Sequence, residues 1–171
     1  MGYAFYLRFD AASEAAVAAL WQALVDSGAG DGMQRLGHPP HLSLAVLDEE
    51  PPPTVVEAAL DAVADLAGFG VQLGEVKRFP NTPIVWLAAE GGSALADLHA
   101  RLLSCLPEAL VWEHYRLGQW TPHVALQMQG DAVTAMAIAE AEWPALVSAR
   151  VVALELVQFP PVVVLKSLCL R

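Results

Sequence analysis

Hydrophobic and polar side chains follow two different periodicities along this chain, and each periodicity predicts one type of secondary structure. Alternation of apolar and polar residues predicts β-strands over residues 3–9, 71–77, 84–89, 147–158 and 162–170. Helical spacing of apolar residues predicts helices over residues 13–27 and 93–106. The apolar stripe of the first helix is Val17, Leu20, Trp21 and Leu24, and that of the second is Leu95, Leu98, Leu102 and Leu106.

Residue types that cap helices indicate two further helices. Thr54 and Glu57 have the spacing of a capping box, in which two side chains accept hydrogen bonds from backbone amides at the start of a helix. This box predicts a helix that runs to about Ala67. Asp131 is expected to cap another helix, which ends near Trp143.

Two more predicted strands carry a histidine at the same position. The first reads HLSL from His41 and the second reads HVAL from His123, and a proline-containing segment precedes each. Alternation places His41 and Ser43 on one face of the first strand, and His123 and Ala125 on one face of the second. Two imidazoles therefore face one cleft if the strands lie side by side. The second strand has Ala125 where the first has Ser43.

The predicted elements occur twice in the same order: strand, helix, histidine strand, helix, strand. We therefore expect an internal duplication, with repeats over residues 3–78 and 84–158 and a final strand over residues 162–170. Chance agreement of the element order is the alternative. The predicted fold is α+β, a single bilobal domain over residues 1–171. Its two sheet-and-helix lobes are expected to be related by pseudo-two-fold symmetry around a central groove.

Composition narrows the classes of partner. The formal net charge is −10 and the chain has only nine lysines and arginines, which argues against a protein that grips long nucleic acid. A small nucleotide or an RNA terminus is still compatible with this charge. No apolar run is long enough to cross a membrane. The charged residues Arg8 and Asp10 interrupt the apolar residues near the start of the chain, so we expect no secretory signal there. We expect a cytoplasmic monomer without a membrane partner.

The two histidine segments resemble the motifs of a known family. Residues 40–45, PHLSLA, are similar to the first motif of the 2H phosphoesterase superfamily, and residues 120–126, WTPHVAL, are similar to the second. Residues 84–87, IVWL, resemble the strand that opens the second half of these proteins. The branch that the chain resembles most is the group of 2′-5′ RNA ligases and cyclic phosphodiesterases.

This resemblance implies a function as well as a bilobal fold. It implies hydrolysis or transesterification of 2′,3′-cyclic phosphates or 2′-5′ phosphodiesters, without a metal or another cofactor. By position in the motifs, His41 and His123 correspond to the acid–base pair and Ser43 to the hydroxyl that binds a phosphoryl oxygen. Two departures stand out. Ala125 replaces the second hydroxyl residue, and Gln127 and Met128 follow the second motif where members of the family often have a basic residue.

The chemistry of the residues agrees with that implication. Opening a cyclic phosphate requires one group that takes a proton from water and one that gives a proton to a ribose oxygen. Two imidazoles can do both, since their ordinary pKa lies near neutrality. The charge that develops on the phosphoryl oxygens needs hydrogen-bond donors. Sequence does not say which histidine is the acid and which is the base.

Other residues near the motifs are weaker candidates for the site. Thr121, Gln127 or a backbone amide could supply the donor that the second motif lacks. Arg35 and Arg116 precede the two motifs and could reach a phosphate, although solvated loop arginines are the common alternative. Tyr115 and Trp120 could stack on a base, with core packing as the alternative for Trp120.

Two other functions remain open at this stage. A catalytically weakened module that binds a nucleotide or an RNA end would explain Ala125. A metal hydrolase could use His38, His41 and His123, although the prolines between the first two exclude the helical spacing of many zinc sites. His99 lies outside every motif and is expected on the surface of its helix.

Overall fold

The computed structural model describes residues 1–30, 32–144 and 146–170. Its strands are β1 Gly2–Phe9, β2 His41–Leu47, β3 Gly70–Arg78, β4 Val85–Glu90, β5 His123–Gln127, β6 Val147–Phe159 and β7 Val163–Cys169. Its α-helices are α1 Ala11–Asp26, α2 Gly32–Arg35, α3 Pro53–Asp61, α4 Gly92–Cys105 and α5 Ala132–Glu142. Each strand that alternation predicted is present, so the mixture of helices and strands expected from the sequence is confirmed.

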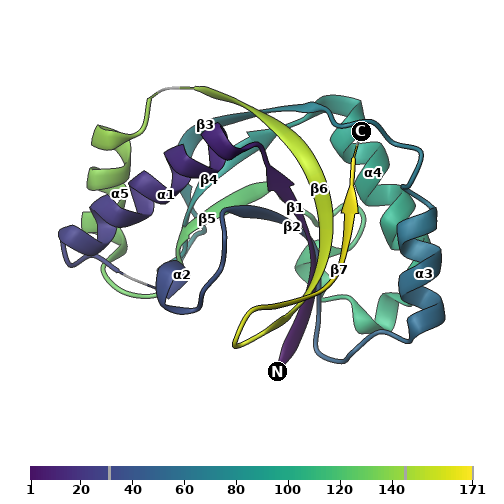
Figure 1. The fold of residues 1–171 in the computed structure, drawn as a ribbon. Coiled ribbons are helices and arrows are strands. Elements are labelled where there is room, and N and C mark those ends of the chain that lie inside the picture. Colours follow the sequence, from purple (N-terminus) through teal and green to yellow (C-terminus); the bar gives the residue numbers. More distant parts are fainter. Residues whose placement is uncertain (31, 145, 171) are drawn as a thin grey trace.

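The strands form one antiparallel sheet in the order β2-β1-β6-β3-β4-β5, and β7 pairs with β6 outside this path. The sheet is strongly curled, as Figure 1 shows, so that β2 and β5 approach each other although they stand at opposite ends of the order. This closure brings the two histidine strands together.

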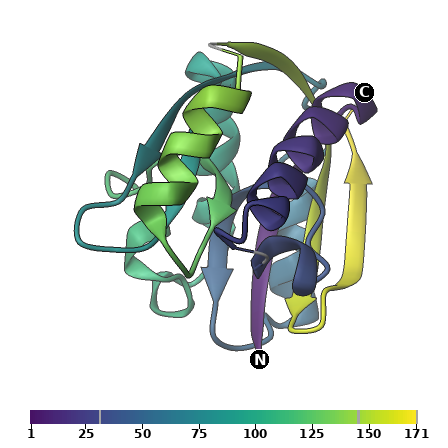
Figure 2. The same cartoon turned by 90° about the vertical axis from the view of Figure 1, so that its left-hand side faces the viewer.

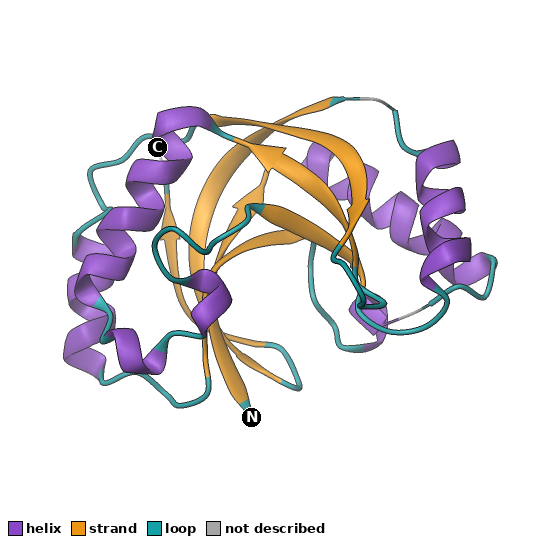
Figure 3. Cartoon of the chain, turned by 180° about the vertical axis from the view of Figure 1, so that it is seen from behind, coloured by secondary structure: helices purple, strands orange, loops and turns teal. Residues whose placement is uncertain are grey.

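Helices cover the sheet in two pairs. Helix α1 packs against α5, and α3 packs against α4. Figure 2 shows α1 and α5 side by side on one face of the molecule, and Figure 3 shows the sheet between the two groups of helices. Each pair takes one helix from the first half of the chain and one from the second. The bilobal α+β architecture expected from the sequence is therefore present.

The strand order is symmetric in one respect. Exchanging β1, β2 and β3 for β4, β5 and β6 converts the order into itself read backwards. Exchanging α1 with α4 and α3 with α5 likewise converts the α1–α5 pair into the α4–α3 pair. A duplicated chain would produce this arrangement, and the duplication itself stays a prediction.

The apolar stripes predicted for α1 and α4 form the core under the sheet. In α1 the buried apolar residues are Val17, Leu20, Trp21 and Leu24, and in α4 and its C-cap they are Leu95, Leu98, Leu102 and Leu106. Asp131 caps α5 as predicted, because its carboxylate accepts hydrogen bonds from the amides of Val133 and Thr134. No helix in the described parts of the chain is long and apolar enough to cross a membrane.

The capping box predicted at Thr54 is wrong. Helix α3 begins one residue earlier, at Pro53, with Pro52 as its N-cap and no side-chain hydrogen bond there. Proline suits this position because its ring fixes a helical φ and it has no amide hydrogen that needs a partner. The helix also ends earlier than predicted, at Asp61, because the chain continues in tight turns with hydrogen bonds from Val63 to Leu60 and from Ala64 to Asp61.

Candidate active site

The pocket between β2 and β5 contains both motif histidines. It encloses about 190 Å³, and His41 and Ser43 enter it from β2 while His123 and Ala125 enter it from β5. The other residues that line it are Ala4, Tyr6, Met33, Leu36, His38, Val46, Trp112, Tyr115, Met128 and Phe159. The curled sheet therefore brings together the side chains that alternation had placed on one face of each strand.

The same local contact orients both histidines. Nδ1 of His41 lies 2.7 Å from the carbonyl oxygen of Pro39, and Nδ1 of His123 lies 2.7 Å from the carbonyl oxygen of Thr121. A carbonyl oxygen only accepts, so in each ring Nδ1 carries the hydrogen and donates it. The lone pair of each neutral imidazole is consequently on Nε2, the atom that can exchange a proton with a substrate.

A second pair of equivalent contacts fixes the strands behind the histidines. Nε1 of Trp120 donates to the carbonyl oxygen of Ser43 at 3.0 Å, and Nε1 of Trp21 donates to the carbonyl oxygen of Ala125 at 3.1 Å. Trp120 was a candidate for stacking on a base. The structure places it outside the residues that line the pocket, against His99 with ring centroids 3.8 Å apart.

Burial and charge set the protonation of the two histidines. His41 is only 8% exposed, and burial lowers its pKa to about 3. The hydrogen bond to the Pro39 carbonyl acts in the opposite direction and raises this pKa. Positive charge on His38, His123 or Arg8 lowers that pKa further. Burial also lowers the pKa of His123, and the Thr121 carbonyl opposes this effect. Both rings are therefore neutral at pH 7.

Two phenols lie beside the first motif. Tyr6 of β1 is opposite Ser43 in the β1–β2 register, and its ring centroid is 4.4 Å from that of His41. Tyr115 lies in the 3-10 helix Glu113–Tyr115 and lines the pocket with Ser43, whose side chain opposes the effect of burial on the pKa of the Tyr115 phenol. Burial raises the pKa of both phenols. They remain hydroxyl groups at neutral pH, able to donate to a bound anion.

The second motif has aromatic neighbours in place of hydroxyls. The ring of His123 lies edge-on to Phe79 and Trp86, with centroid distances of 5.2 Å and 5.7 Å, and these two aromatic rings stack on each other. Trp86 is opposite Ala125 in the β4–β5 register. This half of the site is thus apolar around its imidazole.

Four of the weaker candidates lie outside the lining of the pocket. Thr121 is exposed, and it contributes its carbonyl to His123. Gln127 is buried beside the backbone of Gly30, where an added Cβ would lie 2.6 Å from its Oε1. Arg116 donates to the carbonyl of Val111 and pairs with Glu108 at 3.5 Å. Arg35 is exposed at the end of α2.

Sequence reasoning missed Trp112, which comes from an irregular segment, whereas Tyr115 of the same segment was a candidate for stacking on a base. Tyr115 and Trp112 reach the pocket because the amide of Trp112 donates to the carbonyl of Val46, which extends the edge of β2. His99 was expected on the surface and is buried at 3% exposure. Its Nε2 lies 3.0 Å from the carbonyl oxygen of Tyr115 and its ring stacks on Trp120, two contacts made by residues distant in the sequence.

The composition of the lining limits how the pocket can bind an anion. No lysine or arginine is among the described residues that line it. Its polar side-chain groups are the hydroxyls of Tyr6, Ser43 and Tyr115, the imidazoles of His38, His41 and His123 and the indole N–H of Trp112. Across the described ranges, no three histidine, cysteine, aspartate or glutamate side chains are grouped as metal ligands. The donor set suits a phosphodiester held by neutral groups.

Comparison with protein families decides the relationship. The family model of the 2′-5′ RNA ligase superfamily matches residues 9–160. This chain belongs to the 2′-5′ RNA ligase superfamily. Membership confirms the resemblance of the histidine motifs to 2H phosphoesterases, and it places the chain among enzymes that act on phosphodiester bonds. Comparison with curated protein sequences gives no significant match.

Several solved structures share this fold. TT0787 of Thermus thermophilus matches with a TM-score of 0.68 and 21% identity, over 100% of this chain and 98% of the other. E. coli LigT complexed with 3′-AMP matches with a TM-score of 0.61 and 18% identity, over 99% and 97%. Usb1 of Kluyveromyces marxianus matches with a TM-score of 0.53 and 14% identity, over 99% and 98%. The curled sheet with helices on its outside is therefore common to these proteins.

Proposed function

We propose that this protein is a metal-independent phosphodiesterase that hydrolyses a small nucleoside 2′,3′-cyclic phosphate or a short 2′-5′-linked RNA end. One observation carries the proposal: His41 and His123 enter the same pocket with the same tautomer, each fixed by a backbone carbonyl. Two imidazoles with Nε2 available can act on opposite sides of a phosphorus atom. Ser43 is the hydroxyl that would hold a phosphoryl oxygen between them.

The reaction uses one proton transfer at each imidazole. For a cyclic phosphate, a water oxygen attacks phosphorus while one imidazole takes a proton from that water through Nε2. The bond between phosphorus and one ribose oxygen breaks, and the other imidazolium gives its Nε2 proton to that oxygen. The product is a nucleoside phosphomonoester, and the two histidines exchange protonation states in each turnover.

The surroundings of the two rings suggest which is the base. His41 is buried beside His38 and Arg8, and positive charge on either residue disfavours a proton on His41. His41 is therefore the ring that stays neutral and can accept the proton of water. His123 is assigned the acid role, since an anionic substrate beside it favours the imidazolium form.

Ligands of one related protein share chemical groups with the proposed substrate. E. coli LigT has been crystallised with 3′-AMP, NADP+, phosphate and ATP. Each of these compounds contains a phosphate, and three of them are nucleotides. A nucleoside 2′,3′-cyclic phosphate combines the same two parts, a nucleoside and a phosphate, in a form that two histidines can open.

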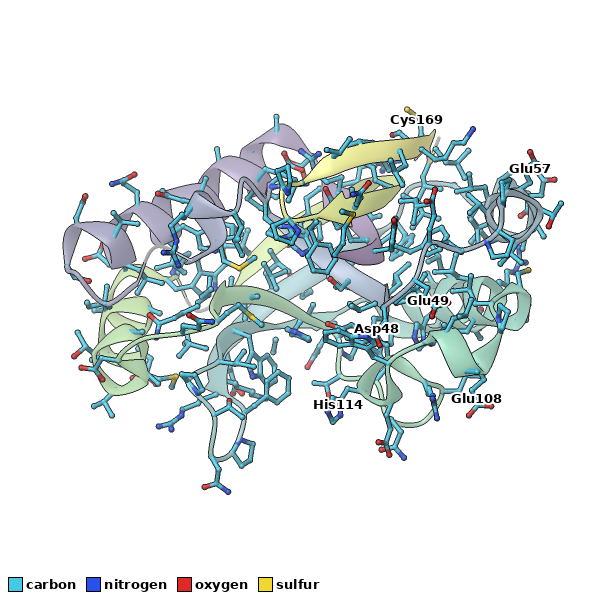
Figure 4. All side chains as sticks on the ribbon, turned by 90° about the horizontal axis from the view of Figure 1, so that it is seen from below. Asp48, Glu49, Glu57, Glu108, His114 and Cys169 are labelled. Atoms are coloured by element: carbon cyan, nitrogen blue, oxygen red, sulfur yellow. The ribbon has the colours of Figure 1, made fainter. Side chains whose placement is uncertain are left out.

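The test is turnover of adenosine 2′,3′-cyclic phosphate and of a 2′-5′-linked dinucleotide in the presence of a chelator. We expect wild-type turnover, and losses of at least about 100-fold in kcat for His41→Ala and for His123→Ala, in line with the size of general acid–base catalysis. His114→Ala is the matched control, because this histidine is exposed and points away from the ribbon in Figure 4. Equal turnover by the wild type and both active-site variants would contradict the proposal.

A second candidate function follows from Ala125. If the missing hydroxyl has removed useful catalysis, the protein is a module of the same fold that binds a nucleotide or an RNA end. Calorimetry would then detect binding of a nucleoside 3′-monophosphate with no turnover of the cyclic phosphate. Restoring the hydroxyl with Ala125→Thr would create activity in that case, whereas in an active enzyme it only increases an existing rate.

A further inference from the structure

His38 is a third imidazole in the pocket, and neither of the two proton transfers uses it. It lines the pocket together with Ala125. Its ring centroid lies 5.1 Å from that of His41, and its ring is edge-on to Phe159 at 5.6 Å. The sequence suggested only metal binding for this residue, and the described side chains form no such group. Another role in the pocket is needed to account for it.

The surroundings of His38 determine where the neutral ring carries its proton. Nδ1 is fully buried and has no hydrogen-bond partner within the described chain, whereas Nε2 is not enclosed in this way. A buried N–H without an acceptor is costly, and such orphaned donors are rare in proteins. We therefore assign the proton to Nε2, where it can reach water or a ligand. Burial lowers the pKa of His38, which keeps the ring neutral at pH 7.

His38 consequently presents a different group to the pocket from the one that His41 and His123 present. His41 and His123 each use the hydrogen on Nδ1 to bind a backbone carbonyl and leave a lone pair on Nε2. His38 has the opposite tautomer and presents an N–H. A lone pair suits proton transfer, whereas an N–H suits a hydrogen bond to a phosphoryl oxygen, and donors to a charged acceptor form the stronger bonds.

We propose that His38 donates a hydrogen bond from Nε2 to a non-bridging phosphoryl oxygen of the substrate, and so supplies the donor that Ala125 lacks. The inference rests on the proposed phosphodiesterase function and adds a phosphate-binding residue from outside both motifs. It also follows from the lining, since the described residues there include no lysine or arginine. In such a pocket each neutral donor contributes a large part of the binding to the phosphoryl group.

Three substitutions separate this hydrogen bond from a packing role. His38→Phe keeps an aromatic ring beside His41 and Phe159 and removes the donor. His38→Gln places an amide N–H near the position of Nε2, and His38→Asn places one near the position of Nδ1. We expect kcat/KM for adenosine 2′,3′-cyclic phosphate to fall about 10- to 100-fold in His38→Phe and in His38→Asn, and about threefold or less in His38→Gln.

A double substitution tests whether His38 replaces the missing hydroxyl. If His38 and the hydroxyl introduced by Ala125→Thr donate to the same phosphoryl oxygen, Ala125→Thr should raise kcat/KM by a larger factor in His38→Phe than in the wild type. Thermal unfolding of each variant tests whether the fold is intact. The pH profile of kcat/KM tests whether His38 acts only through the effect of its charge on the pKa of His41. In that case His38→Gln and His38→Phe would move the profile equally and have equal rates, which overturns the inference.

Binding separates failure of this inference from failure of the proposed function. If the wild type does not turn over the cyclic phosphate, the phosphodiesterase proposal fails, and the affinity for adenosine 3′-monophosphate decides the role of His38. Binding that is about tenfold weaker in His38→Phe and restored in His38→Gln supports the hydrogen bond. Affinities and rates that are the same in the wild type and His38→Phe overturn it.

Discussion

The indole of Trp120 donates its hydrogen bond to the backbone carbonyl of Ser43, a residue 77 positions away in the sequence. This contact links the segment before the second histidine motif to the strand of the first. Trp21 makes the equivalent contact with Ala125 in the other direction. The position of each motif strand therefore depends on a tryptophan from the opposite half of the chain.

Replacing Trp120 with Phe should weaken both the fold and the site. The substitution keeps a ring to stack on His99 and removes the donor to Ser43, which leaves a carbonyl without its partner. We expect a loss of about 1–3 kcal/mol in the free energy of unfolding, measured by urea denaturation. The activity should fall as well, because Ser43 is no longer held. Trp21→Phe is the matched comparison, and an unchanged stability in both variants would show that these bonds contribute little.

Removing the Ser43 hydroxyl should lower kcat/KM more than it lowers stability. Ser43→Ala deletes a donor proposed to bind a phosphoryl oxygen, and the expected loss is about 10- to 100-fold in kcat/KM. The hydroxyl also contacts Tyr115, so a small change in the melting temperature is expected. Steady-state kinetics with the cyclic phosphate measure the effect. A variant with wild-type kcat/KM would remove Ser43 from the proposed site.

The activity should increase as the pH falls below neutrality. Burial lowers the pKa of His123, the proposed acid, so its protonated fraction in the free enzyme decreases as the pH rises through values below 6.5. His41, with a pKa of about 3, remains an unprotonated base over the same range. We expect log kcat/KM to fall by about one unit per pH unit on the alkaline side. A profile that is flat between about pH 5 and about pH 8 contradicts these roles.

Acid should destabilise the protein partly through His41. Its pKa of about 3 in the folded state lies below the ordinary imidazole value of 6.5, so the unfolded chain binds the proton first as the pH falls. Stability is therefore complete above about pH 6.5 and is lost progressively below it, by about 3 kcal/mol at pH 4 from this residue. Urea unfolding at several pH values measures the slope. His41→Gln should make this slope shallower.

Much of the fold could be predicted because burial is periodic in this sequence. Leu20 and Leu24 in α1, and Leu98 and Leu102 in α4, occur at helical spacing and are buried on the face that the spacing indicates. Alternation likewise placed His41 and Ser43 on the same side of β2. These local patterns survive folding because each follows from the geometry of one element.

The remainder of the site depends on contacts between distant segments. Tyr115 and Trp112 reach the pocket through irregular chain, which has no periodicity to indicate a face. His99 is buried because Trp120 and the carbonyl of Tyr115 cover it, and neither is near it in the sequence. Arg116 looked suitable for binding a phosphate, but its guanidinium is engaged by Val111 and Glu108. The residue types alone do not indicate which hydrogen-bond and ion-pair partners such a side chain has in the folded protein.

The position of β2 and β5 at opposite ends of the strand order has a mechanical consequence. No backbone ladder joins these two strands in the described chain, and the halves of the sheet meet through a short run of pairs between Gly70–Leu73 of β3 and Val147–Arg150 of β6. The separation of the two imidazoles is therefore set by the bend of the whole sheet together with the side-chain bond from Trp120 to the Ser43 carbonyl. A change in twist where β3 pairs with β6 would increase or decrease the distance between the two imidazoles without breaking any hydrogen bond inside either motif.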